Sequence, residues 1–262
     1  MAVAGSESGA LGRDYVNALA RGLEVIRVFT RHRPRMTLSE VAELTGMTRA
    51  TVRRFLLTLA QEGYVETDGK YFSLKPKVLE LGFSALSSMN IWDVMQPVLE
   101  TLSAALSESC FAAVLDCESV IYVARATPVN RRINVGISIG SRVPAHCVST
   151  GRVLLAALPE DALREYIDTM TLTRFTSNTV TSRVQLRDML EAVRRQGFSI
   201  VDQELEVGLR SLSVPVRDGS GAIIAALNVC CPSTRISLEE MQTRILAMTL
   251  ASAREIGAAL HE

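Results

Sequence analysis

Three arginines and two threonines fall between residues 48 and 54, in a stretch with the apolar period of a helix. Val52, Phe55, Leu56 and Leu59 recur on one face, which leaves the polar side chains on the others. In a DNA major groove, arginine bridges guanine O6 and N7, threonine meets a base or phosphate, and alanine touches a thymine methyl group. The residues suited to this chemistry are Thr48, Arg49, Ala50, Thr51, Arg53 and Arg54.

The residues before this stretch predict the element that would position it. Thr37 and Glu40 have the spacing of a capping box, which opens a short helix over Leu38–Leu44. Gly46 follows in a tight turn, where glycine takes a left-handed conformation that other residues resist. A second helix then runs over Arg49–Glu62, and helix, glycine turn and helix in this order predict a helix-turn-helix.

Elements on both sides extend the helix-turn-helix. A helix from Tyr15 precedes it, and two extended runs, Tyr64–Thr67 and Lys70–Leu74, flank an Asp68-Gly69 turn after it, which predicts a wing. The alternative is a basic domain that docks on another protein. The capping box, glycine turn, arginine face and wing in sequence favour DNA binding.

The charge of the chain is divided between its two parts. The 262 residues carry 28 Lys plus Arg and 28 Asp plus Glu, but residues 1–77 hold 12 against 8 and residues 78–262 hold 16 against 20. A basic module joined to an acidic one is expected when one end meets a polyanion. With 48% apolar residues, no apolar run near 20 residues and no signal-peptide pattern, we expect a folded cytoplasmic protein without a membrane partner.

The cysteines and histidines do not form a metal or catalytic pattern. Five cysteines contain no CxxC pair, and the three histidines leave His146 alone as a plausible base. We therefore expect no metal, no cofactor and no catalytic residue. A thiol redox sensor or small-molecule enzyme is the alternative, but adjacent pairs such as Cys230-Cys231 point to opposite faces of a strand, so buried packing thiols are expected.

The rest of the chain predicts a helical linker and an α+β domain. We place the DNA-binding domain at 14–76, the linker at 77–92 and the second domain at 93–262. Helical spacing over Val78–Leu86 and Ile91–Leu106 fits helices that pack on their own chain or pair with a second copy. Strands are expected at Phe111–Leu115, Val120–Ala124, Ile133–Ser138, Phe198–Asp202, Ser211–Val216 and Ala222–Cys230, with helices at Val153–Leu158, Asp161–Ile167 and Val184–Gln196 and a capping box at Ser237 and Glu240. This order favours helices on an antiparallel sheet.

The region Tyr15–Leu74 resembles the winged helix-turn-helix domain of IclR-type bacterial transcription regulators. The resemblance is carried by Arg21-Gly22-Leu23, Thr37–Ala42 and Thr51–Leu59. It implies that Arg21 and Lys70 support the DNA backbone from the first helix and the wing.

The second domain resembles the GAF-like effector-binding domain of the same family. The segments Gly140–Ala156, Gly208–Val216 and Ala225–Val229 carry the resemblance. The chain looks most like the Pca and Pob regulators of the β-ketoadipate pathway. That branch implies operator DNA, a homodimer or tetramer, and an effector such as protocatechuate, 4-hydroxybenzoate or β-ketoadipate.

The resemblance also implies where the effector binds. The family's pocket maps to Ser149, Thr150, Leu209, Ser211, Asn228 and Cys230, with Asp202 or its neighbours near the mouth. His146 is a candidate to hydrogen-bond a phenol, and a structural role for this histidine is the alternative. Ser149 and Thr150 would open a helix, whose free amides favour a carboxylate.

Two points about the ligand stay open. Arg125, Arg132, Arg142 and Arg152 are each candidates to pair with its carboxylate. A small acid such as glyoxylate or pyruvate is the alternative effector, although members that bind small acids have small or apolar residues in place of Ser149 and Thr150 and serines in place of Asn228 and Cys230.

Overall fold

The computed structural model describes residues 15–30, 33–82, 91–128 and 136–260, with only the backbone at residues 91 and 92. The chain divides into two compact units, Met1–Ala85 and Leu86–Glu262, and each is described by itself. The division falls within the segment 77–92 that the sequence predicts to be a linker. There, Leu79 and Leu81 are exposed in a helical turn over 79–82, and the rest of the expected helix to Leu86 lies outside the described residues.

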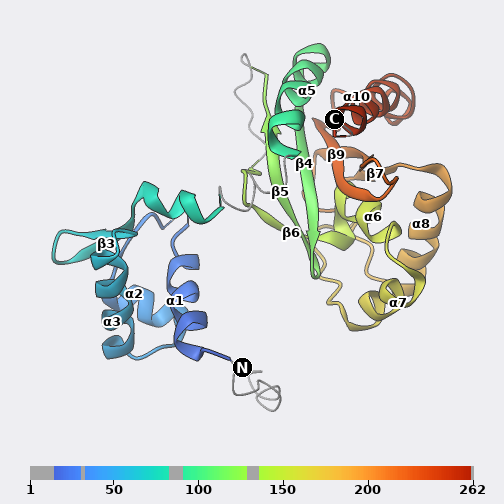
Figure 1. Ribbon diagram of the computed structural model, residues 1–262. Coiled ribbons are helices and arrows are strands. Elements are labelled where there is room, and N and C mark those ends of the chain that lie inside the picture. The colour runs from blue at the N-terminus through green and yellow to red at the C-terminus, as the bar shows by residue number, and fades with distance from the viewer. Residues whose placement is uncertain (1–14, 31–32, 83–90, 129–135, 261–262) are drawn as a thin grey trace. The chain divides into compact units, whose positions relative to one another are not determined.

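The first unit is a winged helix-turn-helix (Figure 1). Its elements are α1 (Asn17–Arg27), β1 (Arg35–Thr37), α2 (Leu38–Thr45), α3 (Arg49–Gln61), β2 (Val65–Thr67), β3 (Tyr71–Leu74) and the 3₁₀ turn η1 (Pro76–Val78). The capping box at Thr37 and Glu40 is formed, and Gly46 takes φ 64°, as the sequence predicts. The strand β1 is an addition, because its three residues pair with β3 in a sheet of order β1-β3-β2.

The apolar side chains at and before α1 divide between the core of the first unit and its surface. Val25 is fully buried with Val41, Val52 and Leu56 of the next two helices. Val16, Leu19 and Leu23, in contrast, lie on the surface, and their exposed fractions are 61%, 64% and 47%. We call these three residues the α1 strip.

The second unit is built on a six-stranded antiparallel sheet of order β6-β5-β4-β9-β8-β7. Its strands are β4 (Ser109–Asp116), β5 (Ser119–Ala126), β6 (Arg142–Pro144), β7 (Ser199–Asp202), β8 (Leu209–Arg217) and β9 (Ile223–Pro232). The sequence prediction of a strand at Ile133–Ser138 is wrong in its described part, because residues 136–138 are not extended into the sheet. Residues 133–135 lie outside the described chain.

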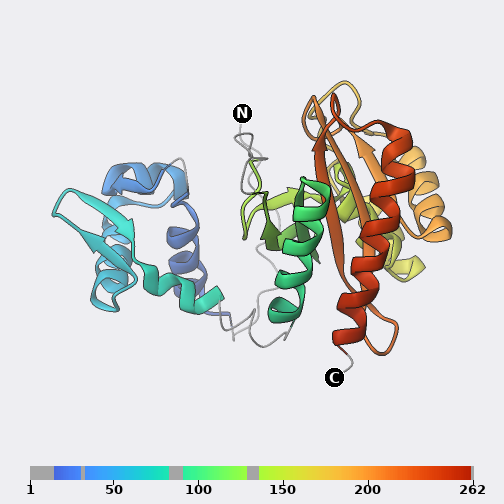
Figure 2. The same ribbon diagram turned by 90° about the horizontal axis from the view of Figure 1, so that it is seen from above.

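Helices cover both faces of this sheet (Figures 1 and 2). They are α5 (Ile91–Leu106), η2 (Ala145–Cys147), α6 (Ser149–Ala156), α7 (Glu160–Thr169), α8 (Arg183–Gln196), α9 (Leu238–Glu240), the π-helical turn η3 (Met241–Ile245) and α10 (Leu246–Ala259). α5 and α10 pack together on one face, and α6 lies on the other with α8 outside it. Strand alternation separates the faces: Leu212 and Val214 of β8 join the α5 and α10 core, while Ser211 and Ser213 face α6.

The close approach of α6 to η2 requires Gly151. A Cβ added at Gly151 would overlap the backbone of Ala145. Because backbone cannot rotate away as a flexible side chain does, we expect Gly151→Ala to lower the free energy of unfolding by about 3 kcal/mol. Urea denaturation measures this, with Gly82→Ala as the control, since a Cβ there meets no atom of the described residues within 4 Å. Equally small decreases in the free energy of unfolding of both variants would show that η2 moves to accept the Cβ at little cost.

Candidate nucleic-acid interface and effector site

The surface of α3 presents the residues that the sequence selects for DNA. Thr48 caps the helix by accepting from the Thr51 amide at 3.3 Å, and the two hydroxyl oxygens lie 2.9 Å apart. The residues Arg49, Ala50, Arg53 and Arg54 are exposed, and Thr51 is half-buried. Since Val52 and Leu56 hold the opposite face in the core, α3 offers three guanidinium groups to a partner.

The wing differs in detail from the sequence prediction. The Asp68 amide donates to the Tyr71 carbonyl at 3.3 Å, so Gly69 and Lys70 form the centre of the turn and Lys70 is not a strand residue. The Asp68 carboxylate accepts from the amides of Tyr71 at 2.8 Å and Lys70 at 3.0 Å, which lowers its pKa. The Lys70 ammonium lies 5.1 Å from the Tyr71 ring centre, at the exposed tip.

Two further cations flank this surface. Arg35, which sequence reasoning missed, pairs with Asp68 and stands 4.7 Å from the Tyr71 ring. Arg21 is exposed on α1, next to Gly22, whose backbone approaches the side chain of Phe55 in α3. Exposed cationic side chains thus come from α1, α3 and the wing of one unit.

In the second unit, three predicted effector residues meet in one buried polar cluster. Ser149, at the start of α6, has its Oγ 2.9 Å from Ser211 Oγ and 3.0 Å from Asn228 Nδ2, which donates to it. Ser213, which sequence reasoning missed, completes the group at 2.8 Å from Ser149 Oγ. The cross-strand register of β8 and β9 places Ser213 opposite Asn228, so the pairing of these two strands identifies it.

Two more predicted residues border this cluster. The Cys230 thiol lies 2.9 Å from Asn228 Oδ1, to which it donates. Thr150 Oγ1 stands 3.5 Å from the hydroxyl of Tyr122 on β5, and the Tyr122 ring packs edge-on against Phe111 with 5.4 Å between centroids. Burial raises the pKa of Tyr122, which keeps it a neutral hydrogen-bonding group.

A cavity opens beside the cluster. Its lining residues are Tyr122, Ile137, Cys147, Val148, Val201, Glu204, Leu205, Leu209, Ser211 and Cys230. The predicted residues Leu209, Ser211 and Cys230 are among them. The cavity volume is about 10 Å³, which is room for about one water molecule.

The structure places Asp202 and His146 away from this lining. Asp202 pairs with Arg210 through hydrogen bonds of 2.9 and 3.0 Å. Asp202 follows the cavity-lining Val201 on β7, and Arg210 lies between the cavity-lining residues Leu209 and Ser211 on β8. His146 is fully buried, with Nε2 3.0 Å from the Thr173 carbonyl oxygen, and among the described residues Nδ1 has no hydrogen-bond partner. Burial, with the nearby charge of Arg152, lowers the pKa of His146 and keeps the ring neutral.

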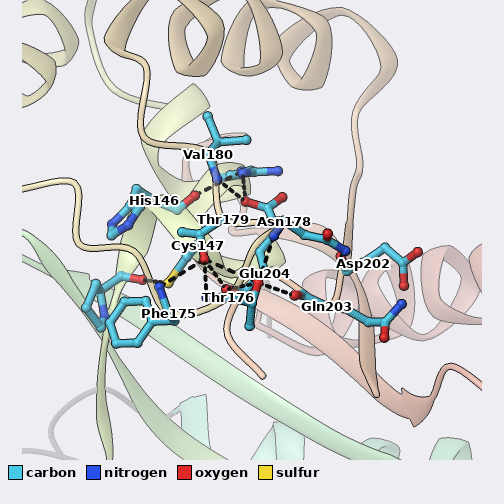
Figure 3. A network of polar contacts seen from close by, with 12 residues as sticks. His146, Cys147, Phe175, Thr176, Asn178, Thr179, Val180, Asp202, Gln203 and Glu204 are labelled. Carbon is cyan, nitrogen blue, oxygen red and sulfur yellow. Dashed lines mark hydrogen bonds and ion pairs between the residues drawn. The ribbon is translucent and has the colours of Figure 1, made fainter. Parts of the chain in front are cut away.

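The four candidate arginines have different surroundings. Arg142 pairs with Asp116, Arg125 Nε donates to Thr127 Oγ1 at 3.0 Å, and Arg132 lies outside the described residues. Arg152 on α6 is buried, and its Nη2 donates to Glu204 Oε2 at 2.7 Å while Nε donates to the His146 carbonyl at 3.0 Å. Figure 3 shows how Thr176, Thr179 and Val180 gather around Glu204.

Four of the five cysteines are buried, and Cys117 is exposed. Burial raises the pKa of Cys147 to about 12 and the pKa values of Cys110 and Cys230 as well, so these thiols stay protonated at neutral pH. We expect the native protein to react with one equivalent of Ellman's reagent per chain, and Cys117→Ser to remove that reaction. Fast reaction of a second thiol of the native protein would favour the redox-sensor alternative.

Metal and membrane features can be stated for the described part of the chain. In residues 15–30, 33–82, 91–128 and 136–260, no three or more His, Cys, Asp or Glu side chains group as metal ligands would. None of the helices described is both long and apolar enough to cross a bilayer.

Family models match both units of the chain. The IclR helix-turn-helix domain model matches residues 18–69, and the bacterial transcriptional regulator IclR C-terminal model matches residues 83–258. The chain belongs to the IclR family of bacterial transcription regulators. The predicted resemblance is therefore confirmed for the helix-turn-helix and the effector-binding domain alike.

This IclR regulator is similar to other bacterial regulators over most of its length. It is 42% identical to the Pca regulon regulatory protein of Pseudomonas putida, over 93% of this chain and 84% of that one. A putative transcriptional regulator from Rhodococcus sp. RHA1 superposes with a TM-score of 0.83 at 47% identity, covering 94% of this chain and 98% of that one.

A third relative is described with an aromatic ligand. It is a double mutant of the PobR inducer-binding domain from Acinetobacter, in complex with 3-hydroxybenzoic acid. It superposes with a TM-score of 0.60 at 33% identity and covers 63% of this chain and 95% of its own.

Proposed function

We propose that this IclR-family regulator controls genes of aromatic-acid catabolism and responds to an aromatic acid or to β-ketoadipate. The observation that carries the proposal is the buried cluster of Ser149, Ser211 and Asn228 beside a cavity with an aromatic wall at Tyr122. Polar groups that converge on one part of a mostly apolar cavity are what a small organic ligand needs. The Pseudomonas and Acinetobacter relatives support the class of ligand.

The DNA-binding part is assigned to residues 14–76, joined by a linker at 77–92 to an effector domain at 93–262. Arg49, Ala50, Thr51, Arg53 and Arg54 would meet base edges and phosphates from α3, since they lie on or near its exposed surface. Thr48, Arg21 and Lys70 would contact the DNA backbone around it.

The acting form is proposed to be a homodimer or tetramer on double-stranded operator DNA. The α1 strip, at Val16, Leu19 and Leu23, supports this, because three neighbouring apolar side chains on one helix are exposed in the single chain. Two copies would also present two α3 helices to a symmetric operator. The ligand then acts by binding one arrangement of the copies more tightly than another.

The first experiment measures the melting temperature of the purified protein against protocatechuate, 4-hydroxybenzoate, β-ketoadipate, glyoxylate and pyruvate. A ligand at about 100 times its dissociation constant adds about 2.7 kcal/mol to stability, which raises the melting temperature by several degrees. We expect the shift with an aromatic acid or β-ketoadipate. A shift with glyoxylate or pyruvate alone would favour the small-acid alternative.

The residue assignment is tested separately. Asn228→Leu removes the donor that bonds Ser149 and Ser213, and should abolish the ligand-induced shift while operator binding persists. Leu227→Met, a volume-conserving change on the opposite face of β9, is the control. A full ligand response in Asn228→Leu would show that the pocket lies elsewhere.

A further inference from the structure

The ion pair of Arg152 and Glu204 is buried next to the proposed effector cavity. The two side chains are 2% and 7% exposed, and Nη2 and Oε2 are 2.7 Å apart. Burying two charges costs more than burying apolar side chains of similar volume, so such a pair is a poor way to gain stability alone. Glu204 also lines the cavity, so the guanidinium is one side chain away from it.

Glu204 belongs to the loop 203–208 between β7 and β8, and polar contacts fasten this loop to the segment 173–181. Glu204 Oε2 accepts from the Val180 amide at 3.0 Å, and the Glu204 carbonyl accepts from Thr179 Oγ1 at 2.6 Å and Thr176 Oγ1 at 3.3 Å. Figure 3 shows these residues converging on Glu204. Glu204 thus joins the loop 203–208 to the segment 173–181 and, through Arg152, to α6.

The cavity must grow to admit an organic acid. At about 10 Å³ it has room for about one water, whereas a benzoate has nine heavy atoms. Its walls on β5, β8 and β9 are rigid, because each of these strands is paired on both sides. The loop 203–208 reaches solvent, with Val207 74% exposed, so this wall opens at the lowest cost.

We propose that Glu204 is an internal stand-in for the effector's carboxylate. On binding, the acid displaces Glu204 from Arg152, the guanidinium takes the ligand carboxylate, and the loop 203–208 is released. The inference rests on the proposed function, and it assigns recognition of the ligand's negative charge to the Arg152 guanidinium.

The chemistry of the pair fits this exchange. Arginine stays protonated at any physiological pH and its planar fork matches a carboxylate in two-point contact. Replacing one carboxylate by another leaves no buried charge unpaired, while Glu204 follows its loop toward water. The hydroxyl and amide groups of Ser149, Ser213 and Asn228, already bonded to one another, then serve the uncharged end of the ligand.

Calorimetric titration of the full-length protein with 4-hydroxybenzoate and its neutral amide tests the exchange. Glu204→Gln removes the competing charge, so the affinity for the acid should rise about tenfold while that for the amide stays constant. Arg152→Gln/Glu204→Gln should bind acid and amide equally. If the wild type prefers the acid and both variants keep the same preference and affinity, the exchange is wrong and the proposed function stands. If none of the three proteins binds 4-hydroxybenzoate, protocatechuate or β-ketoadipate, the proposed effector class itself fails.

A second measurement uses the wild type alone and does not depend on the folding of a variant. Hydrogen exchange at the amides of Val180 and of the loop 203–208 should become at least several-fold faster when 4-hydroxybenzoate is bound. Unchanged or slower exchange there, with the acid bound, would overturn the displacement of Glu204.

Discussion

Replacing Arg53 and Arg54 together by alanine is expected to lower operator affinity by roughly 100-fold or more, because each arginine that binds DNA contributes about 1–3 kcal/mol. Both side chains are exposed on α3, away from the buried residues Val52 and Leu56. The dependence of log affinity on log salt should become shallower by about 0.9 for each phosphate that the protein no longer neutralises.

The measurement is fluorescence anisotropy on a duplex selected from a random library with the wild-type protein, at several salt concentrations. Arg164→Ala/Arg195→Ala is the matched control, since these arginines are exposed on helices of the other unit. Melting curves should match the wild type for both double variants. An unchanged affinity and salt slope in Arg53→Ala/Arg54→Ala would remove α3 as the reading element.

The second large effect concerns the buried ion pair. Arg152→Met should lower the free energy of unfolding of the second unit by about 3–5 kcal/mol, because the buried Glu204 carboxylate would lose its counter-charge. The loops fastened through Glu204 should also become more accessible to proteolysis, which gives a readout besides the melting temperature.

A double-mutant cycle separates this effect from poorer packing. Arg152→Met/Glu204→Leu removes both charges and should recover most of the stability, because an apolar pair of similar volume needs no counter-charge. Arg210→Met is a useful comparison, since its partner Asp202 is 32% exposed and water can solvate the carboxylate left behind. Additive losses in the double variant would mean that the charges of Arg152 and Glu204 do not interact.

The sequence by itself determined the helix-turn-helix, because every signal for it is local. A cap at Thr37, a left-handed turn at Gly46 and a cap at Thr48 each involve residues within a few positions of one another. Strands such as β8 and β9 followed from the same local patterns. The segments around Ser149, Ser211 and Asn228 also resembled the family's sequences closely enough to predict that these residues share one site.

The tertiary structure decided what depends on register and on partners far apart in the chain. Glu204 meets Arg152 across 52 residues, and Ser213 meets Ser149 across 64, so no local pattern selects either partner. Asp202, expected at the mouth of the pocket, pairs with Arg210, because strand residues alternate between the faces of a sheet and a shift of one position moves a side chain across it. In the same way, the sequence predicted a helix from Tyr15, but only packing showed that the α1 strip is left exposed. Local sequence thus fixes which elements form, whereas the pairing of distant elements fixes which side chains share a site.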